Sequence, residues 1–148
     1  MSGQNDFWRE AMRKGMGNTA FLRALGGELV SFENGRGRMR LPFAPHLVGD
    51  ASTGVIHGGV LTALLDQGCG MAVGSALRAP AMIATLDLRI DYMKPAVPKI
   101  DILVESECLK IGHEIAFARA IAFQESRDAP VAIANGSFML TRIEGTQP

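Results

Sequence analysis

One stretch of the sequence decides the fold, and it reads Thr53-Gly-Val-Ile-His-Gly-Gly-Val-Leu-Thr-Ala-Leu-Leu-Asp-Gln-Gly-Cys-Gly-Met-Ala-Val73, continuing to about Leu77. Read at 3.6 residues per turn, its apolar side chains leave no wide polar face, so a helix here should be covered nearly all round. Gly68 and Gly70 each cost up to about 1 kcal/mol relative to alanine in a helix interior, and close approach of a sheet would offset that cost. The stretch therefore predicts a long central helix with other elements wrapped around it.

The composition is that of one ordinary globular domain. Of the 148 residues, 47% are hydrophobic and 20% are charged, with fifteen basic and fifteen acidic residues scattered along the chain. Neither a membrane span nor a basic face for nucleic acid is expected. Cys69 and Cys108 stand in no metal-ligand spacing, which predicts reduced packing residues, no metal site and a cytoplasmic location. The first ten residues lack a basic region followed by an apolar core, so no secretory signal is predicted.

Helical and strand patterns flank the central stretch on both sides. Phe7, Trp8 and Met12 recur at helical spacing, and Asn5 or Asp6 can cap that helix. The expected elements, in order, are helices at 5–16 and 19–25, strands at 28–33 and 36–41 around an Asn34-Gly35 hairpin turn, a loop at 45–53, the central helix, and strands at 82–92, 99–110, 115–124 and 131–142.

This order of elements favours one fold class. A curled antiparallel sheet around the helix, an α+β layer fold, best buries one long helix that lies between an early hairpin and a later strand meander. We expect an N-terminal helical segment at 1–26 and a single compact domain at 27–148 that holds the sheet and the central helix.

A single carboxylate, Asp66, interrupts the apolar helix. Desolvation raises the pKa of such a group unless donors or a cation reach it. One interpretation is a general base or nucleophile in a pocket wall. The other is a buried acid that bonds the neighbouring backbone or faces solvent at a helix bend, and the residue taken alone supports both equally.

Three residues at the start of the helix are candidates for binding a substrate carbonyl. The first turn of a helix offers unpaired N–H groups and the positive end of the dipole, and Gly58 and Gly59 would let a substrate approach them closely. His57 could orient a substrate or cap the turn. The alternative is that the glycines only shape the turn from loop to helix.

The spacing of Gly58 and Asp66 has a geometric consequence. Eight residues along a straight helix separate them by roughly 12 Å and by about 80° in azimuth. Groups that react with one carbonyl should lie within about 3 to 3.5 Å of it, so a single helix cannot easily supply both. Two antiparallel copies of the helix can. The sequence therefore predicts an active site shared across a homodimer, with paired sheet edges as the contact.

Two motifs carry a resemblance to a known family. They are Gly54-Val-Ile-His-Gly-Gly-Val-Leu-Thr-Ala-Leu-Leu-Asp66 and Thr85-Leu-Asp-Leu-Arg-Ile-Asp-Tyr-Met-Lys-Pro-Ala96. In this order and spacing they resemble the signature of hotdog-fold thioesterases of the PaaI type, including the THEM2 group, over about 49–138. The resemblance implies a hotdog thioesterase domain, hydrolysis of an acyl-CoA substrate, a homodimer that often pairs again into a homotetramer, and no metal or redox cofactor.

Carried over position by position, the resemblance assigns roles to four residues. Gly58 becomes the backbone N–H donor to the thioester carbonyl, and Asp66 the general base or nucleophile. Thr85 stands where the family places a hydroxyl that helps hold the attacking water. His57 matches the histidine at the mouth of the pocket.

The chain departs from the family at one position. The family commonly has an asparagine six residues before the histidine, and this chain has Ala51. The change removes a side-chain contact near the thioester or the water. Asp50, Ser52 and Thr53 are the neighbouring candidates to replace it.

Further residues are candidates for substrate binding. Lys and Arg suit phosphate, so cations near strand ends or turns could bind the anionic end of CoA, although each is singly also typical of a solvated sheet edge. The acyl group is expected between the helix and the dimer partner. The candidates for the anionic end are Arg89, Lys94, Lys110 and His113, and those for the rest of the substrate are Gly59, Leu61, Leu65 and Met82.

The leading hypothesis is an acyl-CoA thioesterase, since one base and one oxyanion donor can suffice for an electrophilic thioester. A non-catalytic acyl-CoA-binding hotdog protein is the alternative, and Ala51 favours it. A hotdog dehydratase is a third, lower-ranked hypothesis, because this chain shows no second acid and histidine at the spacing which that chemistry would need. Aryl-acetyl, medium-chain and long-chain acyl groups all stay open.

Overall fold

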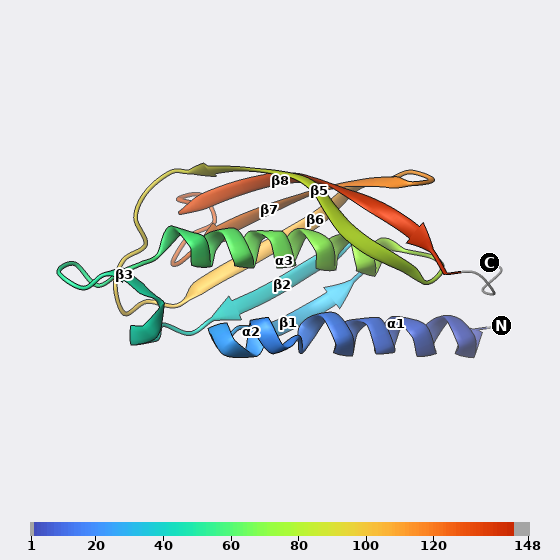
Figure 1. The fold of residues 1–148 in the computed structure, drawn as a ribbon, viewed down its shortest axis with the longest axis horizontal. Helices are drawn as coiled ribbons and strands as arrows, with labels where there is room; N and C mark the ends of the chain where they lie inside the picture. Colours follow the sequence, from blue (N-terminus) through green and yellow to red (C-terminus); the bar gives the residue numbers. More distant parts are fainter. Residues whose placement is uncertain (1, 144–148) are drawn as a thin grey trace.

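A six-stranded antiparallel sheet curls around one long helix in the computed structural model, which describes residues 2–143 (Figure 1). The helices are α1 (Ser2–Gly17), α2 (Ala20–Leu25) and α3 (Gly58–Ala76), with a short 3-10 helix, η1 (Pro45–Leu47). The strands are β1 (Glu28–Glu33), β2 (Arg36–Leu41), β3 (Val48–Asp50), β4 (Val55–Ile56), β5 (Ala81–Tyr92), β6 (Ile102–Ile111), β7 (Ile115–Phe123) and β8 (Ala132–Arg142). The predicted α+β hotdog fold is confirmed.

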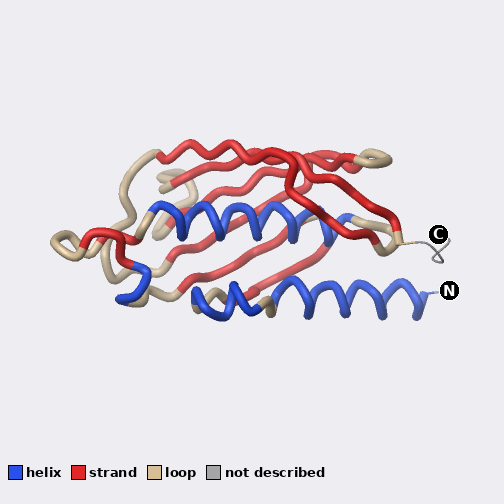
Figure 2. Tube along the Cα trace, viewed as in Figure 1, coloured by secondary structure: helices blue, strands red, loops and turns tan. Residues whose placement is uncertain are grey.

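The order of the strands across the sheet is β1-β2-β6-β7-β8-β5. Strands β6, β7 and β8 form the expected meander, but β5 does not pair with β6, the next strand in the chain. It pairs with β8 and becomes an edge of the sheet, because the chain after β5 crosses to the side of β2 before it forms β6. Strands β3 and β4 form a separate two-stranded ribbon, which projects at the end of the molecule where α3 begins (Figure 2).

The core lies between α3 and the concave face of the sheet. Leu64, Leu65 and Val73 of the helix are fully buried. The expectation that the helix is covered nearly all round is wrong in its first half, where Thr62 and Asp66 are only half-buried. The sheet curls only part of the way around the helix, and α1 packs beside the second half of α3 but does not reach the first (Figure 2).

The local patterns predict most element boundaries. The Asn34-Gly35 turn has positive φ at both residues, 51° and 75°, as a two-residue hairpin turn requires. Thr19 caps α2 by accepting a hydrogen bond from the Leu22 N–H at 3.1 Å, and Gly26 ends that helix in the left-handed conformation.

Two local expectations are wrong. Helix α1 begins at Ser2, so Asn5 and Asp6 lie inside it and do not cap it. The expected loop at 45–53 contains η1 and β3.

No helix within residues 2–143 is long and apolar enough to cross a bilayer. The division of the chain at residue 26 stays a prediction.

The two helix glycines differ in how closely the sheet approaches them. A Cβ at Gly68 would lie 3.0 Å from Val104 Cγ1 of β6, whereas the nearest atom to a Cβ at Gly70 would be Met16 Cε of α1, at 3.7 Å. The expected close approach of the sheet is therefore confirmed at Gly68 and not at Gly70.

Replacing these glycines by alanine should therefore have opposite effects. Gly70→Ala should raise the free energy of unfolding by up to about 1 kcal/mol, since alanine favours a helix and the methyl group meets only ordinary contacts. Gly68→Ala should lower it by about 1 kcal/mol or more because the methyl group crowds Val104. Urea unfolding at one fixed protein concentration measures both. Equal stabilisation of the two variants would contradict the close approach at Gly68.

Candidate active site

Asp66 and Thr85 meet although they come from separate motifs. Asp66 lies halfway along α3, on the side of the helix that the sheet leaves partly open. Its Oδ1 accepts a hydrogen bond from Thr85 Oγ1 at 2.8 Å. Thr85 stands at a bulge of β5, where the register with β8 shifts between Thr85 and Asp87. A bulge changes the direction in which the following side chains point. This bulge comes directly after Thr85, whose hydroxyl faces the Asp66 carboxylate.

The start of α3 presents one available backbone donor. His57 is the N-cap, and its Nδ1 accepts a hydrogen bond from the Gly59 N–H at 2.9 Å. A neutral His57 ring that accepts at Nδ1 carries its proton on Nε2. The Gly58 N–H has no acceptor among residues 2–143. Of the two glycines, therefore, Gly58 can offer its N–H to a ligand and Gly59 cannot without releasing His57.

Tyr92 is a residue at this end of the helix to which the sequence reasoning assigned no role. Its hydroxyl bonds the Thr62 hydroxyl and lies 3.5 Å from the Gly58 carbonyl oxygen, to which it donates. Tyr92 belongs to the second motif, but the face of the sheet to which its side chain points depends on the bulge in β5. After the extra residue, Leu88, Ile90 and Tyr92 face α3, and alternation counted without the bulge would turn them away.

The structure keeps Gly58 and Asp66 apart in one chain. Helix α3 is continuous from Gly58 to Ala76, so the straight-helix separation of roughly 12 Å applies. No hydrogen bond within the described chain links the Asp66–Thr85 pair to the start of the helix. Within a single chain, therefore, Gly58 and the Asp66–Thr85 pair lie at different places along α3.

The four cations proposed for the anionic end of CoA do not converge. Arg89 pairs with Asp91 at 3.2 Å, and strand alternation after the bulge places it on the outer face of the sheet, away from α3. Lys94 is exposed just beyond β5. Lys110 lies near the end of β6 and His113 lies in the turn to β7, and β6 is three strands from β5. One chain thus forms no single phosphate site from these residues.

The predicted acyl contacts differ in their access to a ligand. Leu65 has 0% of its surface exposed and Leu61 is also buried, so neither can contact an acyl group in this conformation. These side chains pack against the sheet because they lie on the side of α3 that faces the concave surface of the sheet. Met82, in contrast, is 68% exposed on the edge strand β5.

The position of the family asparagine lies at the exposed tip between β3 and β4. Ala51 is exposed there. Asp50 Oδ1 accepts hydrogen bonds from the Ser52 N–H at 2.9 Å and from Ser52 Oγ at 2.6 Å, and these bonds hold the pKa of the Asp50 carboxyl below its usual value. The Thr53 hydroxyl donates to the Asp50 carbonyl. These three polar residues bond one another, and none of those bonds reaches Asp66 or Gly58.

Neither cysteine is placed to act as a nucleophile. Burial, with a smaller contribution from the nearby Asp66 charge, raises the pKa of the Cys69 thiol to about 12. Burial also raises the pKa of the half-buried Cys108. Both are free cysteines, as expected. Among residues 2–143, no group of three His, Cys, Asp or Glu side chains is arranged to hold a metal ion.

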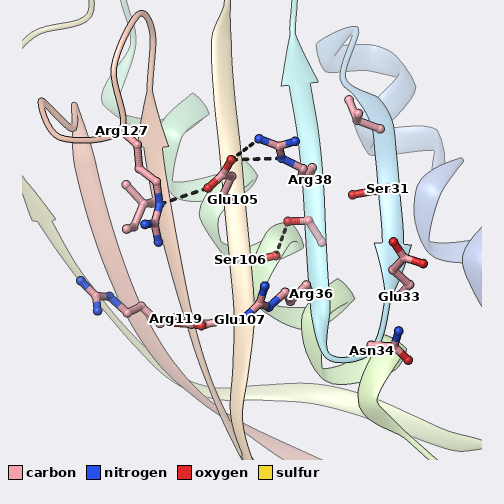
Figure 3. Close-up of a pocket in the computed structure, with 13 residues that line it drawn as sticks. Ser31, Glu33, Asn34, Arg36, Arg38, Glu105, Ser106, Glu107, Arg119 and Arg127 are labelled. Atoms are coloured by element: carbon pink, nitrogen blue, oxygen red, sulfur yellow. Dashed lines mark hydrogen bonds and ion pairs between the residues drawn. The ribbon is translucent and has the colours of Figure 1, made fainter.

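A larger hollow of the described chain lies elsewhere. It measures about 1000 Å³ and opens on the outer face of the sheet, over β1, β2, β6 and β7, with α3 behind the strands (Figure 3). Arg38 and Arg127 both pair with Glu105, and the whole lining holds four arginines and three glutamates. No residue proposed for the site lines this hollow.

Comparison with known proteins decides the family. The model of the thioesterase superfamily matches residues 53–131, more than half of the chain. The chain belongs to the thioesterase superfamily. The matched region contains α3 and β5, and with them Gly58, Asp66 and Thr85. The predicted enzyme class, a thioester hydrolase, is confirmed at this level.

Individual members of the superfamily resemble this thioesterase along most of its length. Medium/long-chain acyl-CoA thioesterase YigI of Escherichia coli (strain K12) is 29% identical over 133 residues, which are 81% of this chain and 84% of that protein. The crystal structure of zebrafish thioesterase superfamily member 2 is 26% identical, with a TM-score of 0.73 over 88% of this chain and 94% of that one. A mutant of the phenylacetic acid degradation protein PaaI of Thermus thermophilus shares the fold, with 24% identity and a TM-score of 0.72 over 84% and 100%. The resemblance to the PaaI and THEM2 types is confirmed.

Proposed function

We propose that this thioesterase hydrolyses an acyl-CoA thioester to the free acid and CoA. The observation that carries the proposal is the half-buried Asp66 carboxylate, whose Oδ1 is bonded to Thr85 and whose second oxygen is left for a reactant. The free Gly58 N–H is the matching oxyanion donor. A positioned base beside a preorganised donor is what acyl transfer to water needs.

The reaction follows from these two groups. The thioester carbonyl oxygen accepts a hydrogen bond from the Gly58 N–H, which stabilises the negative charge of the tetrahedral intermediate. Asp66 takes a proton from water while the water oxygen bonds to the carbonyl carbon. The carbon–sulfur bond then breaks, and the thiolate receives the proton. Direct attack by Asp66, with water resolving the resulting anhydride, uses the same geometry.

The two groups act together only when two chains combine. We infer a homodimer in which Gly58 of one chain faces Asp66 of the other. Two observations support it: β5 is a twelve-residue edge strand, and its outer side chains Met82 and Leu86 are large, apolar and exposed. Unpaired edges of this kind are normally covered. The open side of α3 lies next to this edge, since Thr85 of β5 touches Asp66.

The proposal has two further parts, the tetramer and the cellular location. We propose that two dimers pair again into a tetramer, as in the resemblance drawn from the sequence. We also place the enzyme in the cytoplasm, because its two free cysteines suit a reducing compartment. No cofactor or metal is needed for the proposed reaction.

A non-catalytic acyl-CoA-binding protein is the second candidate function. Ala51 favours it, because the exposed tip at this position offers no side-chain amide to the thioester or water, and the neighbouring polar residues bond one another. Thiol release from a panel of acyl-CoA thioesters separates the two functions.

Asp66→Asn should lower kcat by about 10²-fold or more, because the amide keeps the size of the side chain and removes the base. Thiol release from acyl-CoA measures the change, and a melting curve confirms folding. Thr85→Ser, which keeps the hydroxyl that bonds Asp66, is the matched control and should retain most of the activity. An undiminished rate in Asp66→Asn would remove Asp66 from the mechanism.

Gly58→Pro should lower kcat by about 10²-fold because proline has no N–H to donate. The first helical position accepts proline, and His57 already has the extended conformation that proline requires before it, with φ −61° and ψ 134°. Gly58→Ala is the control: it keeps the N–H, and its Cβ would meet only Tyr92 Cε1, at 3.7 Å. Equal loss in both variants would show that crowding, and not the donor, matters.

Mixed dimers of Gly58→Pro and Asp66→Asn chains should recover activity. If each site takes Gly58 from one chain and Asp66 from its partner, every mixed dimer has one intact site. Random re-association then restores about a quarter of the wild-type activity. Each variant alone, taken through the same unfolding and refolding, is the control. No recovery in dimers shown to be mixed would place both groups in one chain and overturn the shared site.

A further inference from the structure

An apolar groove of about 390 Å³ opens beside the start of α3. One wall is α2, which contributes Phe21 and Leu25, and the other is the first turns of α3, with Val60 and Ala63. No charged carboxylate, lysine or arginine lines it. Its volume falls within the range of about 300 to 1,000 Å³ that small-molecule sites occupy.

The wall formed by α2 is held firmly although the helix has only six residues. Leu22 anchors it in the core with 2% of its surface exposed, and Thr19 and Gly26 cap its two ends. His46 Nε2 lies 3.2 Å from the Ala24 carbonyl oxygen and ties the helix to η1. The wall is therefore preorganised and needs no ordering when a ligand binds.

Phe21 and Leu25 lie four residues apart on α2 and so face the same way, into the groove. Phe21 is 63% exposed. A large aromatic side chain gains stabilisation when an apolar group covers it, at about 25 cal/mol per Å². The groove thus offers an exposed apolar wall to an apolar ligand group.

The groove borders the proposed reaction site. His57 and Gly59 line it, and Gly58, whose N–H is free, lies between them in the sequence. A thioester whose carbonyl oxygen accepts from Gly58 therefore brings the group attached to its carbonyl carbon beside the groove. Helix α2 precedes residue 53, where the superfamily match begins.

We propose that this groove binds the acyl chain, and that Phe21 and Leu25 of α2 select its length. The inference rests on the proposed function and deepens it. The groove accepts an unbranched, uncharged acyl chain of medium or greater length and disfavours acyl groups that end in a carboxylate. Each methylene that the groove buries should improve binding by about fourfold until the groove is filled.

The test is the dependence of kcat/KM on acyl length, from four to sixteen carbons. Phe21→Ala should lower the ratio of kcat/KM for the twelve-carbon over the four-carbon substrate by about tenfold, and Phe21→Leu should lower it less. Leu25→Ala is a second, independent variant on the same wall. Phe7→Ala, the same change at an exposed residue of α1, is the control and should leave the ratio as in the wild type. An unchanged ratio in folded Phe21→Leu and Leu25→Ala would overturn the proposal that this groove binds the acyl chain.

A binding measurement separates failure of the groove from failure of the proposed function. Calorimetry with non-hydrolysable S-alkyl CoA thioethers of four and twelve carbons reports the same ratio without catalysis. If the wild type hydrolyses no acyl-CoA but Phe21→Ala loses the preference for the longer thioether, the groove stands and the hydrolase proposal fails. If the wild type hydrolyses acyl-CoA and neither α2 variant changes either ratio, the groove proposal fails and the hydrolase stands.

Discussion

The burial of α3 in the concave face of the sheet is the constraint on which the rest of the structure depends. Leu64, Leu65 and Val73 are fully buried there, and each such side chain contributes about 1.5 to 3 kcal/mol. Gly68 allows the close approach, since a side chain at this position would crowd Val104 of β6. Apolar packing therefore decides how far the helix is turned relative to the sheet, and the polar residues of the helix take the positions that this packing leaves.

One consequence is that the residues of the proposed site lie where the packing is incomplete. The sheet ends at β5 before it has closed around α3, and Asp66 lies in the opening with Thr85 as its partner. At the start of the helix, the capping by His57 uses the Gly59 N–H and leaves that of Gly58 free. An unpaired edge strand beside an open helix side is unfavourable in a lone chain, and the exposed Gly58 N–H is left to solvent. A second copy and a substrate are the proposed partners that satisfy them.

The two N-terminal helices, α1 and α2, lie beside opposite ends of α3. Helix α1 packs beside the second half of α3, where Met16 approaches Gly70. Helix α2 borders the first turns of α3 and forms a wall of the apolar groove. The superfamily match at residues 53–131 covers neither helix.

The sequence by itself determined the long apolar helix, the Asn34-Gly35 turn and the fold class, because each depends on local periodicity or on turn residues that adopt positive φ. It also named the residues of the proposed site through two motifs. Only the tertiary structure decided that β5 pairs with β8, that Leu65 is buried, that Arg89 faces away from α3 and that Tyr92 reaches the start of the helix. Strand neighbours depend on pairing between distant segments, and a one-residue bulge reverses the face of every side chain that follows it. No local pattern encodes either effect.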